Sequence, residues 1–263
     1  MITTDSVNGA PNWLDLATPD LDASTAFYGG VFGWEFRPGG AETGGYGMFT
    51  LDGRKVAGAM TVTADQGAPG WTVYFRSADA DAAVKAAEQA GATVYLRPMD
   101  VLDQGRMAIL ADPAGAAFGI WQPRRHKGFE HVTQDGGLNW VELHTTDAGA
   151  AKEFYNAVLD WDTFDVPFPG GTYTTVNPAG TDENAMFGGI APLGTEPGEA
   201  ELGPHWTPYI HVPDVDAAAA AARKLGGTVR SAPESMAGVG RFATLTDPHG
   251  AVFAVIKGDP NQT

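Results

Sequence analysis

Near the start of the chain, apolar and polar residues alternate in a short run. A segment with helical spacing follows this run. Between Trp13 and Ala17 leucines occupy every second position, so this segment is predicted to be a strand with one apolar face. After Asp20, Phe27 and Val31 lie one turn apart. This spacing predicts a helix that an aspartate caps at its start.

The same order of elements recurs three more times. Residues 71–76 alternate as a strand, and residues 79–90 have helical spacing that ends at a glycine. Two further helices are predicted at 147–159 and 214–225. Short β-type runs follow each helix, and a turn with Asp, Pro and Gly at 112–115 precedes the last strand of the first half. Each half is therefore predicted to contain two β-α-β-β-β units of about sixty residues.

A stretch of the first half occurs again in the second half. The residues that reappear unchanged 127 positions later include Asn12, Trp13, Leu16, Thr18, Asp20, Phe27, Tyr28, Val31 and Trp34. A later block repeats at an offset of 135, so the second half has eight extra residues, which we expect in a loop within 191–204. This self-match indicates a duplication. It predicts domains at 1–130 and 131–263, with a linker around 123–137.

The composition narrows the class of protein. The chain has 263 residues, 43% of them hydrophobic, and no cysteine, so disulfides and thiolate chemistry are excluded. No apolar run is long enough to span a bilayer, and no export signal is recognisable, so we expect a cytoplasmic protein without a membrane partner. The formal net charge of −16 disfavours nucleic acid as a partner.

Four β-α-β-β-β units in two pairs, with Phe-Tyr in the first helix and Asp-Pro-x-Gly before the last strand, resemble the vicinal oxygen chelate superfamily. This superfamily includes glyoxalase I, extradiol dioxygenases, and the fosfomycin-resistance and bleomycin-resistance proteins. The sequence most resembles two-domain glyoxalase-like proteins of actinobacterial type, often labelled hydroxylases. The resemblance implies an α+β fold of two tandem domains. In each, two β-α-β-β-β units form a curved mixed sheet around a cleft, with the helices outside.

The resemblance also implies where a metal would bind. Counted from the shared motifs, its ligand positions fall on Trp13, Gly58, Thr72 and Gly119 in domain one, and on Trp140, Gly189, Thr207 and Ala254 in domain two. None of these is a histidine or a carboxylate, the ligands that such a site needs. We therefore expect no metal and no cofactor, as in the metal-free bleomycin-resistance branch.

The strand faces opposite the leucines are expected to line the clefts. The candidate ligand-binding residues are Trp13, Thr72, Tyr74, Trp121, Trp140, Glu142, Thr207 and Tyr209. Aromatic walls with a few polar groups suit a flat or partly apolar small molecule. The alternative is that the repeated tryptophans only fill a barrel that lost its metal.

Four residues are candidates for catalysis: Asp15, Glu142, His144 and His211. The last three could form an acid/base set or an unusual metal site. Alternatively, the histidines lie at strand ends and take no part in chemistry. Domain two is the preferred site, because it combines Trp140, Glu142 and His144 on one strand face.

Three functional hypotheses follow. The first is metal-independent binding of a small, partly hydrophobic or aromatic molecule related to antibiotic resistance or biosynthesis. The second is a metal-independent enzyme of isomerase, cyclase or lyase type, and the third is a glyoxalase-like or dioxygenase-like metalloenzyme with rearranged ligands. The sequence leaves open the ligand, whether anything is catalysed, which domain is functional, and whether the protein is a homodimer or a monomer with paired domains.

Overall fold

The computed structural model describes residues 1–5, 7–168, 171–194 and 197–259, which contain sixteen strands. Those of the first half are β1 (Pro11–Thr18), β2 (Glu35–Pro38), β3 (Gly47–Leu51), β4 (Arg54–Thr61), β5 (Gly70–Arg76), β6 (Thr93–Val101), β7 (Gly105–Ala111) and β8 (Ala117–Pro123). Those of the second half are β9 (Leu138–Thr145), β10 (Trp161–Phe168), β11 (Gly171–Pro178), β12 (Gly188–Pro192), β13 (His205–His211), β14 (Thr228–Met236), β15 (Gly240–Thr246) and β16 (Val252–Gly258).

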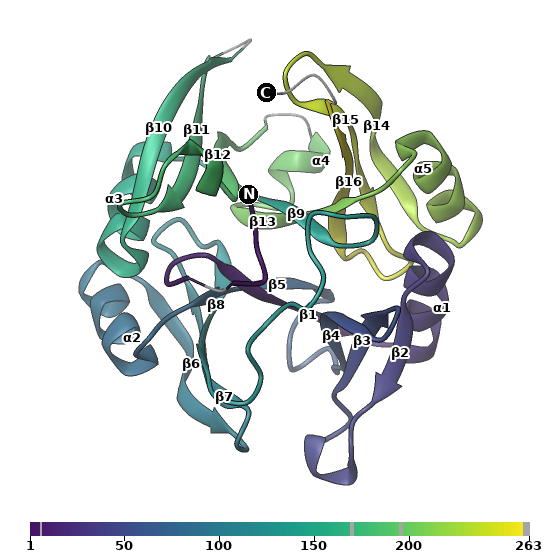
Figure 1. Cartoon of the computed structure of the whole chain (residues 1–263), viewed down its shortest axis with the longest axis horizontal. Coiled ribbons are helices and arrows are strands. Elements are labelled where there is room, and N and C mark those ends of the chain that lie inside the picture. The colour runs from purple at the N-terminus through teal and green to yellow at the C-terminus, as the bar shows by residue number, and fades with distance from the viewer. Residues whose placement is uncertain (6, 169–170, 195–196, 260–263) are drawn as a thin grey trace. The chain divides into compact units, whose positions relative to one another are not determined.

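The strands form two eight-stranded mixed sheets with the same topology (Figure 1). Their orders are β2-β3-β4-β1-β5-β8-β7-β6 and β10-β11-β12-β9-β13-β16-β15-β14. In each unit the first strand pairs in parallel with the last: β1 with β4, β5 with β8, β9 with β12 and β13 with β16. The predicted pattern of four β-α-β-β-β units, and with it the α+β fold class, is confirmed.

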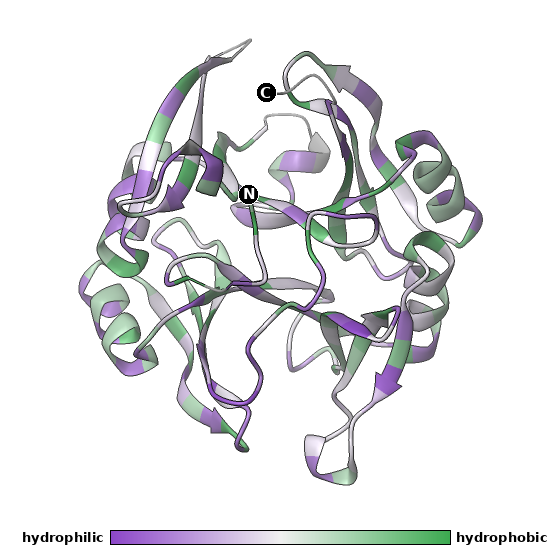
Figure 2. Cartoon of the chain, in the orientation of Figure 1, coloured by the Kyte–Doolittle hydropathy of each residue, from purple (hydrophilic) through white to green (hydrophobic). Residues whose placement is uncertain are grey.

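Each β-α-β-β-β unit contains one long helix where the sequence predicted it. The long helices are α1 (Leu21–Phe32), α2 (Ala80–Gln89), α3 (Ala148–Leu159) and α5 (Val215–Lys224). Each begins after an aspartate whose carboxylate accepts a backbone N–H three residues later at 2.9–3.0 Å: Asp20, Asp79, Asp147 and Asp214. This is the N-cap interaction, which satisfies a helical N–H that has no partner within the helix. Figure 2 shows hydrophobic and hydrophilic residues alternating around these helices, as expected for elements with one buried face.

The apolar strand faces lie in the core as predicted. Leu14 and Leu16 of β1 and Val73 and Phe75 of β5 are fully buried. Phe27 of α1 is buried as well. On the opposite faces Asp15 and Thr72 are half-buried, whereas Trp13 and Tyr74 are buried, so these faces combine polar residues with packed aromatic rings.

The chain folds as two compact units, each containing one β-α-β-β-β unit from each half. Unit 1 comprises the chain up to Trp13, Thr72–Gly128 and Trp140–Thr207, and in it α2 packs against α3 (Figure 1). Unit 2 comprises Leu14–Trp71, Phe129–Asn139 and the chain from Pro208, and in it α1 packs against α5 (Figure 1). Each sheet is thus formed by one half of the sequence, whereas each compact unit combines parts of both halves. The predicted boundary between residues 130 and 131 stays a prediction.

A three-residue chain of hydrogen bonds joins the two halves inside unit 2. Trp71 Nε1 donates to Tyr28 Oη at 3.0 Å, and Tyr28 Oη donates to Asp247 Oδ2 at 3.3 Å. Tyr28 is fully buried, and burial together with the charge of Asp247 raises the pKa of its hydroxyl well above the usual value. The hydroxyl therefore stays protonated and keeps donating to the carboxylate.

Unit 1 contains the same arrangement with the halves exchanged. Trp206 Nε1 donates to Tyr155 Oη at 3.0 Å, and Tyr155 Oη donates to Asp112 Oδ2 at 3.3 Å. The other carboxylate oxygen of Asp112 accepts backbone N–H bonds from the turn that follows it, including that of Gly115 at 2.9 Å. The tyrosine of the repeated helix motif and the aspartate of the repeated turn thus belong to one structural element, which we call the Trp-Tyr-Asp clasp.

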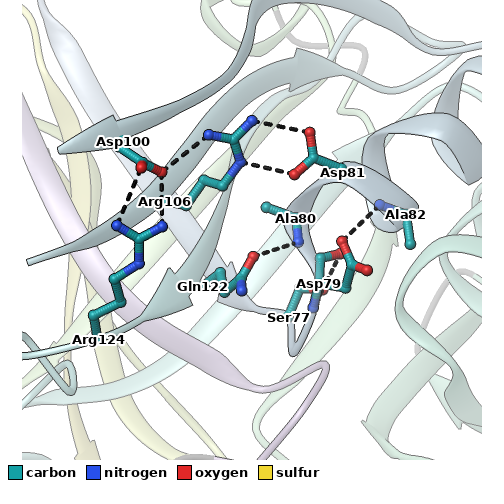
Figure 3. A network of polar contacts seen from close by, with 9 residues as sticks. All are labelled: Ser77, Asp79, Ala80, Asp81, Ala82, Asp100, Arg106, Gln122 and Arg124. Carbon is teal, nitrogen blue, oxygen red and sulfur yellow. Dashed lines mark hydrogen bonds and ion pairs between the residues drawn. The ribbon is translucent and has the colours of Figure 1, made fainter.

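Unit 1 also has an ion-pair network on its surface (Figure 3). Arg106 of β7 binds Asp81 of α2 with two hydrogen bonds of 2.7 and 2.9 Å, and Asp100 of β6 at 3.0 Å (Figure 3). Arg124 binds the same Asp100 carboxylate, and Gln122 of β8 accepts the Ala80 N–H at 2.9 Å (Figure 3). These contacts fix the start of α2 to three strands of its own unit.

Two segments expected to be loops have more structure than predicted. The extra residues of the second half contain a short helix, α4 (Pro197–Ala200). In the predicted linker, Val132 pairs with Leu138, and Gly136 O accepts a 2.8 Å hydrogen bond from Trp34 Nε1. The linker is therefore anchored to the first half by its backbone, which composition alone does not reveal.

The described residues include no helix with the length and apolar character needed to cross a membrane.

Replacing Tyr28 or Tyr155 by Phe should lower the free energy of unfolding by about 1–3 kcal/mol each, because an indole N–H and a buried carboxylate both lose a partner. Urea unfolding followed by circular dichroism measures the change. Tyr95→Phe is the matched control, since Tyr95 is exposed on β6. Equal stability of all three variants would contradict the clasp.

Candidate functional site

The polar face of β9 contains the residues that we predicted as the site of domain two. Trp140, Glu142 and His144 alternate along one face and are half-buried, whereas Val141 and Leu143 on the other face are fully buried. This alternation follows from the two-residue period of a strand. The sequence therefore placed these three side chains on the correct face.

Glu142 is held by hydrogen bonds on both carboxylate oxygens. Tyr173 Oη of β11 donates to Glu142 Oε2 at 2.7 Å, and His144 Nε2 lies 3.2 Å from Glu142 Oε1. Trp140 Nε1 in turn donates to Tyr173 Oη at 3.0 Å. The side chains of Glu142 and His144 expose only 14% and 19% of their surface. The carboxylate is thus oriented and partly dehydrated.

Burial and charge perturb the two neighbours of Glu142. Burial raises the pKa of Tyr173 well above its usual value, and the charge of Glu142 raises it further. For His144, burial lowers the pKa, but the hydrogen bond and charge of Glu142, with a contribution from Glu199, outweigh burial and raise it overall. Tyr173 is therefore a permanent hydrogen-bond donor to the carboxylate.

A glycine makes room for this arrangement. Gly189 of β12 lies beside Glu142 in the parallel β9–β12 register, and a Cβ at Gly189 would overlap the Tyr173 hydroxyl. Gly189 stands at one of the positions where the superfamily would place a metal ligand. Because it has no side chain, the Tyr173 hydroxyl can approach Glu142.

The first half repeats the carboxylate and the tyrosine but not the histidine. Tyr46 Oη donates to Asp15 Oδ1 at 2.6 Å, and Gly58 lies beside Asp15, where a Cβ would overlap the Tyr46 hydroxyl. Ala17 occupies the position equivalent to His144. The tyrosine–carboxylate pair therefore belongs to the duplicated architecture, and the imidazole is an addition of the second half.

The aromatic residues predicted to line the first cleft are mostly internal. Trp13 and Trp121 expose 3% and 6% of their surface, and both rings pack edge-on against His126, with Trp13 at a centroid distance of 4.3 Å. Tyr74 is buried beside Gly119, where a Cβ would overlap its ring. Little of these three rings is left for a ligand.

The remaining predicted residues lie on β5 and β13. Thr72 is half-buried, Tyr209 is buried, and Thr207 is buried with no hydrogen-bond partner for its Oγ1 within the described part of the chain. His211 is half-buried and its Nδ1 lies 2.9 Å from Asp135 Oδ1. His211 belongs to unit 2, whereas Glu142 belongs to unit 1.

Sequence reasoning missed three residues around β9. Tyr173 holds Glu142, as described above. His205 of β13 stacks on His144 with ring centroids 4.8 Å apart and an interplanar angle of 8°. Glu199 of α4 approaches both imidazoles, so that one potential ligand atom of each residue lies within 4.8 Å of the others. Alternation along β13 could have placed His205 on the face of Thr207, but no pattern in the sequence connects Glu199 to β9.

The counted positions do not fit a metal of the expected kind. In the observed strand register, Gly58 pairs with Asp15 and Gly189 pairs with Glu142. The sequence count had placed Trp13 and Trp140, two residues earlier on the same strands, at these ligand positions. The other two pairs are Tyr74 beside Gly119 and Tyr209 beside Ala254. Whether the counted positions or the observed strand pairs are used, each half has at most one carboxylate and no imidazole at these four positions. Zinc enzymes use about three protein ligands.

Surface hollows occur away from β9. One of about 500 Å³ in unit 2 is bordered by Phe32, Leu51, His131 and Asp135, among others. Another of about 400 Å³ in unit 1 is bordered by Val7, Arg76 and Lys127, among others. Both are open to solvent, and neither includes a residue of the cluster around Glu142, although Asp52, Arg54 and Gln134 also border the first. We therefore centre the candidate site on β9.

The fold defines a protein built from four β-α-β-β-β units in two mixed sheets. Residues 10–120 match the model of the Glyoxalase/Bleomycin resistance protein/Dioxygenase superfamily, and residues 140–256 match that of a Glyoxalase-like domain. The chain belongs to this superfamily.

Two kinds of relative share about the same identity with the chain. The anthracycline biosynthesis protein DauV of Streptomyces sp. (strain C5) is 40% identical over 267 residues, covering 95% of this chain and 93% of DauV. CFP32 of Mycobacterium bovis, which carries the name of a glyoxylase, is 40% identical over 261 residues and 97% of each chain.

Solved structures share the fold at low identity. The Mn(II)-bound glyoxalase from Novosphingobium aromaticivorans aligns with a TM-score of 0.62 and 18% identity, covering 98% of this chain and 86% of that one. The 2,3-dioxygenase LapB from Pseudomonas sp. KL28 aligns with a TM-score of 0.64 and 14% identity, covering 97% and 94%. At this identity the likeness concerns the fold alone.

Gly189→Ala should destabilise the protein by about 1–3 kcal/mol, because the new methyl group forces Tyr173 away from Glu142. Gly149→Ala is the control: Gly149 lies in α3, the nearest atom to its Cβ would be 3.3 Å away, and alanine favours a helix by about 1 kcal/mol. Urea unfolding compares the two variants. If Gly189→Ala is as stable as the wild type, the tight fit around Tyr173 is wrong.

Proposed function

We propose that the chain binds a flat, partly aromatic small molecule against the polar face of β9. In this proposal Trp140 supplies the stacking surface and Glu142 accepts a hydrogen bond from a hydroxyl group of the ligand. The observation that carries it is the half-buried Glu142 carboxylate, oriented by Tyr173 and His144 beside an indole ring.

An oriented carboxylate favours binding for a physical reason. A side chain already held in its binding conformation loses little conformational entropy when the ligand arrives. Hydrogen bonds to an ionised acceptor are about twice as strong as those between neutral groups. A phenolic ligand therefore gains both direction and affinity from Glu142, while its ring buries apolar area against Trp140.

The names of two relatives support a proposal for the class of ligand. Two of them are named as anthracycline biosynthesis proteins, each 40% identical to this chain. Anthracyclines have fused planar rings that carry phenolic hydroxyls, which is the chemistry that an indole and a carboxylate recognise. We propose an aromatic polyketide of this kind, or a precursor, as the ligand of this chain.

The setting of this binding follows the expectations from the sequence. We place it in the cytoplasm, in a protein that is a monomer or a homodimer, and without a metal at the superfamily's usual positions. Catalysis of isomerase, cyclase or lyase type is the alternative, and a ligand recovered in altered form would establish it.

Trp140→Ala should weaken binding of a tetracyclic anthracycline aglycone at least tenfold, because the loss of contact area adds to a stacking term of about 0.5–1.5 kcal/mol. Glu142→Gln should weaken it to a similar degree, since the charge-assisted hydrogen bond is lost. Equilibrium dialysis in the presence of a chelator measures the dissociation constants.

Asp15→Asn is the matched control, because Asp15 accepts from the equivalent tyrosine in the first half, where Ala17 stands in place of His144. Its affinity should equal that of the wild type. Unchanged affinity of both β9 variants would move the binding site elsewhere.

A further inference from the structure

We propose that His144, His205 and Glu199 form a binding site for one divalent transition-metal ion of the zinc type. The site is separate from the superfamily's usual ligand positions and does not depend on the proposed ligand.

The three side chains come from separate parts of unit 1 and converge on one point. His144 lies on β9, His205 begins β13, and Glu199 lies on α4. One potential ligand atom from each lies within 4.8 Å of the other two. Zinc bonds of about 2.0–2.2 Å place tetrahedral ligand atoms roughly 3.4 Å apart. Small side-chain rotations that break the parallel stacking of the imidazoles would bring the atoms to this spacing.

Each imidazole has a hydrogen-bond partner that assigns its tautomer. His205 Nδ1 donates to Gly203 O at 2.8 Å, which leaves Nε2 with the lone pair that a metal needs. His144 Nε2 faces Glu142 Oε1 at 3.2 Å, which leaves Nδ1 as the ligand atom. Metal-binding histidines characteristically donate their other N–H to a carboxylate or a backbone carbonyl. Both forms of this support occur here.

The surroundings favour a cation that is partly shielded from water. All three residues are half-buried, so an ion can enter from solvent and yet lose part of its hydration. The carboxylates of Glu142 and Glu199 place negative charge around the two imidazoles. Two nitrogen ligands and one oxygen ligand suit zinc or a similar ion and leave a position open for water. Magnesium, which prefers oxygen ligands, fits poorly.

The three residues have no counterparts in the first half. Ala17 stands where the second half has His144, and Gly70 where it has His205. Glu199 lies within the segment that carries the eight extra residues. The three groups thus occur together at one place in the second half and are not part of the architecture that the two halves share. A bound ion would also fix α4 to β9 at His144 and to the start of β13.

The test uses the full chain without an affinity tag, stripped with a chelator and titrated with zinc chloride by isothermal calorimetry. We expect one ion per chain with a dissociation constant in the micromolar range or tighter. His144→Ala and His205→Ala should each weaken binding at least tenfold. Glu142→Gln should weaken it about tenfold, the usual effect of removing a group that supports a ligand.

His211→Ala is the control, because His211 is a half-buried histidine that pairs with a carboxylate in unit 2. It should bind zinc like the wild type, and magnesium chloride should give no saturable signal. Circular dichroism and thermal unfolding check that each variant is folded. Glu199→Gln changes the third proposed ligand, which lies on the short helix α4 and not on a strand. The absence of stoichiometric zinc binding, or wild-type affinity in both histidine variants, would overturn the site. Dialysis with the aglycone in chelator tests ligand binding separately, so the two proposals can fail independently.

Discussion

The structure depends on a tyrosine hydroxyl that connects the two halves of the chain. In each compact unit an indole N–H, a fully buried tyrosine and a turn aspartate form one hydrogen-bonded clasp. Neither the Phe-Tyr pair nor the Asp-Pro-x-Gly turn completes the clasp within its own half, because Tyr28 contacts Asp247 and Tyr155 contacts Asp112. A buried carboxylate is costly unless it is hydrogen-bonded. The motif that repeats along the sequence is therefore the contact that holds opposite halves together.

The two halves share one architecture but differ in the polar residues around the first strand of each half. Both halves keep a carboxylate that accepts from a tyrosine beside a glycine, so this pair belongs to the common architecture. In the second half, within the described residues, the imidazoles of His144 and His205 and the carboxylate of Glu199 on α4 lie around it. In the first half, the tryptophan equivalent to Trp140 is buried against His126. Packing thus accounts for the first copy, and an oriented polar cluster distinguishes the second.

The fold could be predicted from the sequence because its signals are local or repeated. Asp20 and its three counterparts cap helices, and leucine alternation decides which face of β1 is buried. The site was predicted only in part. Trp140, Glu142 and His144 share a strand, so their common face follows from its period. Tyr173 and Glu199 reach Glu142 and His144 from other elements, and their contacts depend on sheet register and on α4, which no periodicity encodes. The combination of the halves into compact units was likewise not predicted, since it depends on contacts between residues 43 positions apart in unit 1 and 219 positions apart in unit 2.

That combination has a consequence for the order of folding. As the chain leaves the ribosome, Tyr28 emerges 219 residues before Asp247, so unit 2 has to wait for nearly the whole polypeptide. Unit 1 can close earlier, because Asp112 and Tyr155 are only 43 residues apart. Contacts of long sequence separation slow folding, since loop closure is entropically unfavourable before they form. The nascent first half therefore exposes the apolar surface around α1 until the last β-α-β-β-β unit is synthesised, and chaperone demand during synthesis is greatest for unit 2.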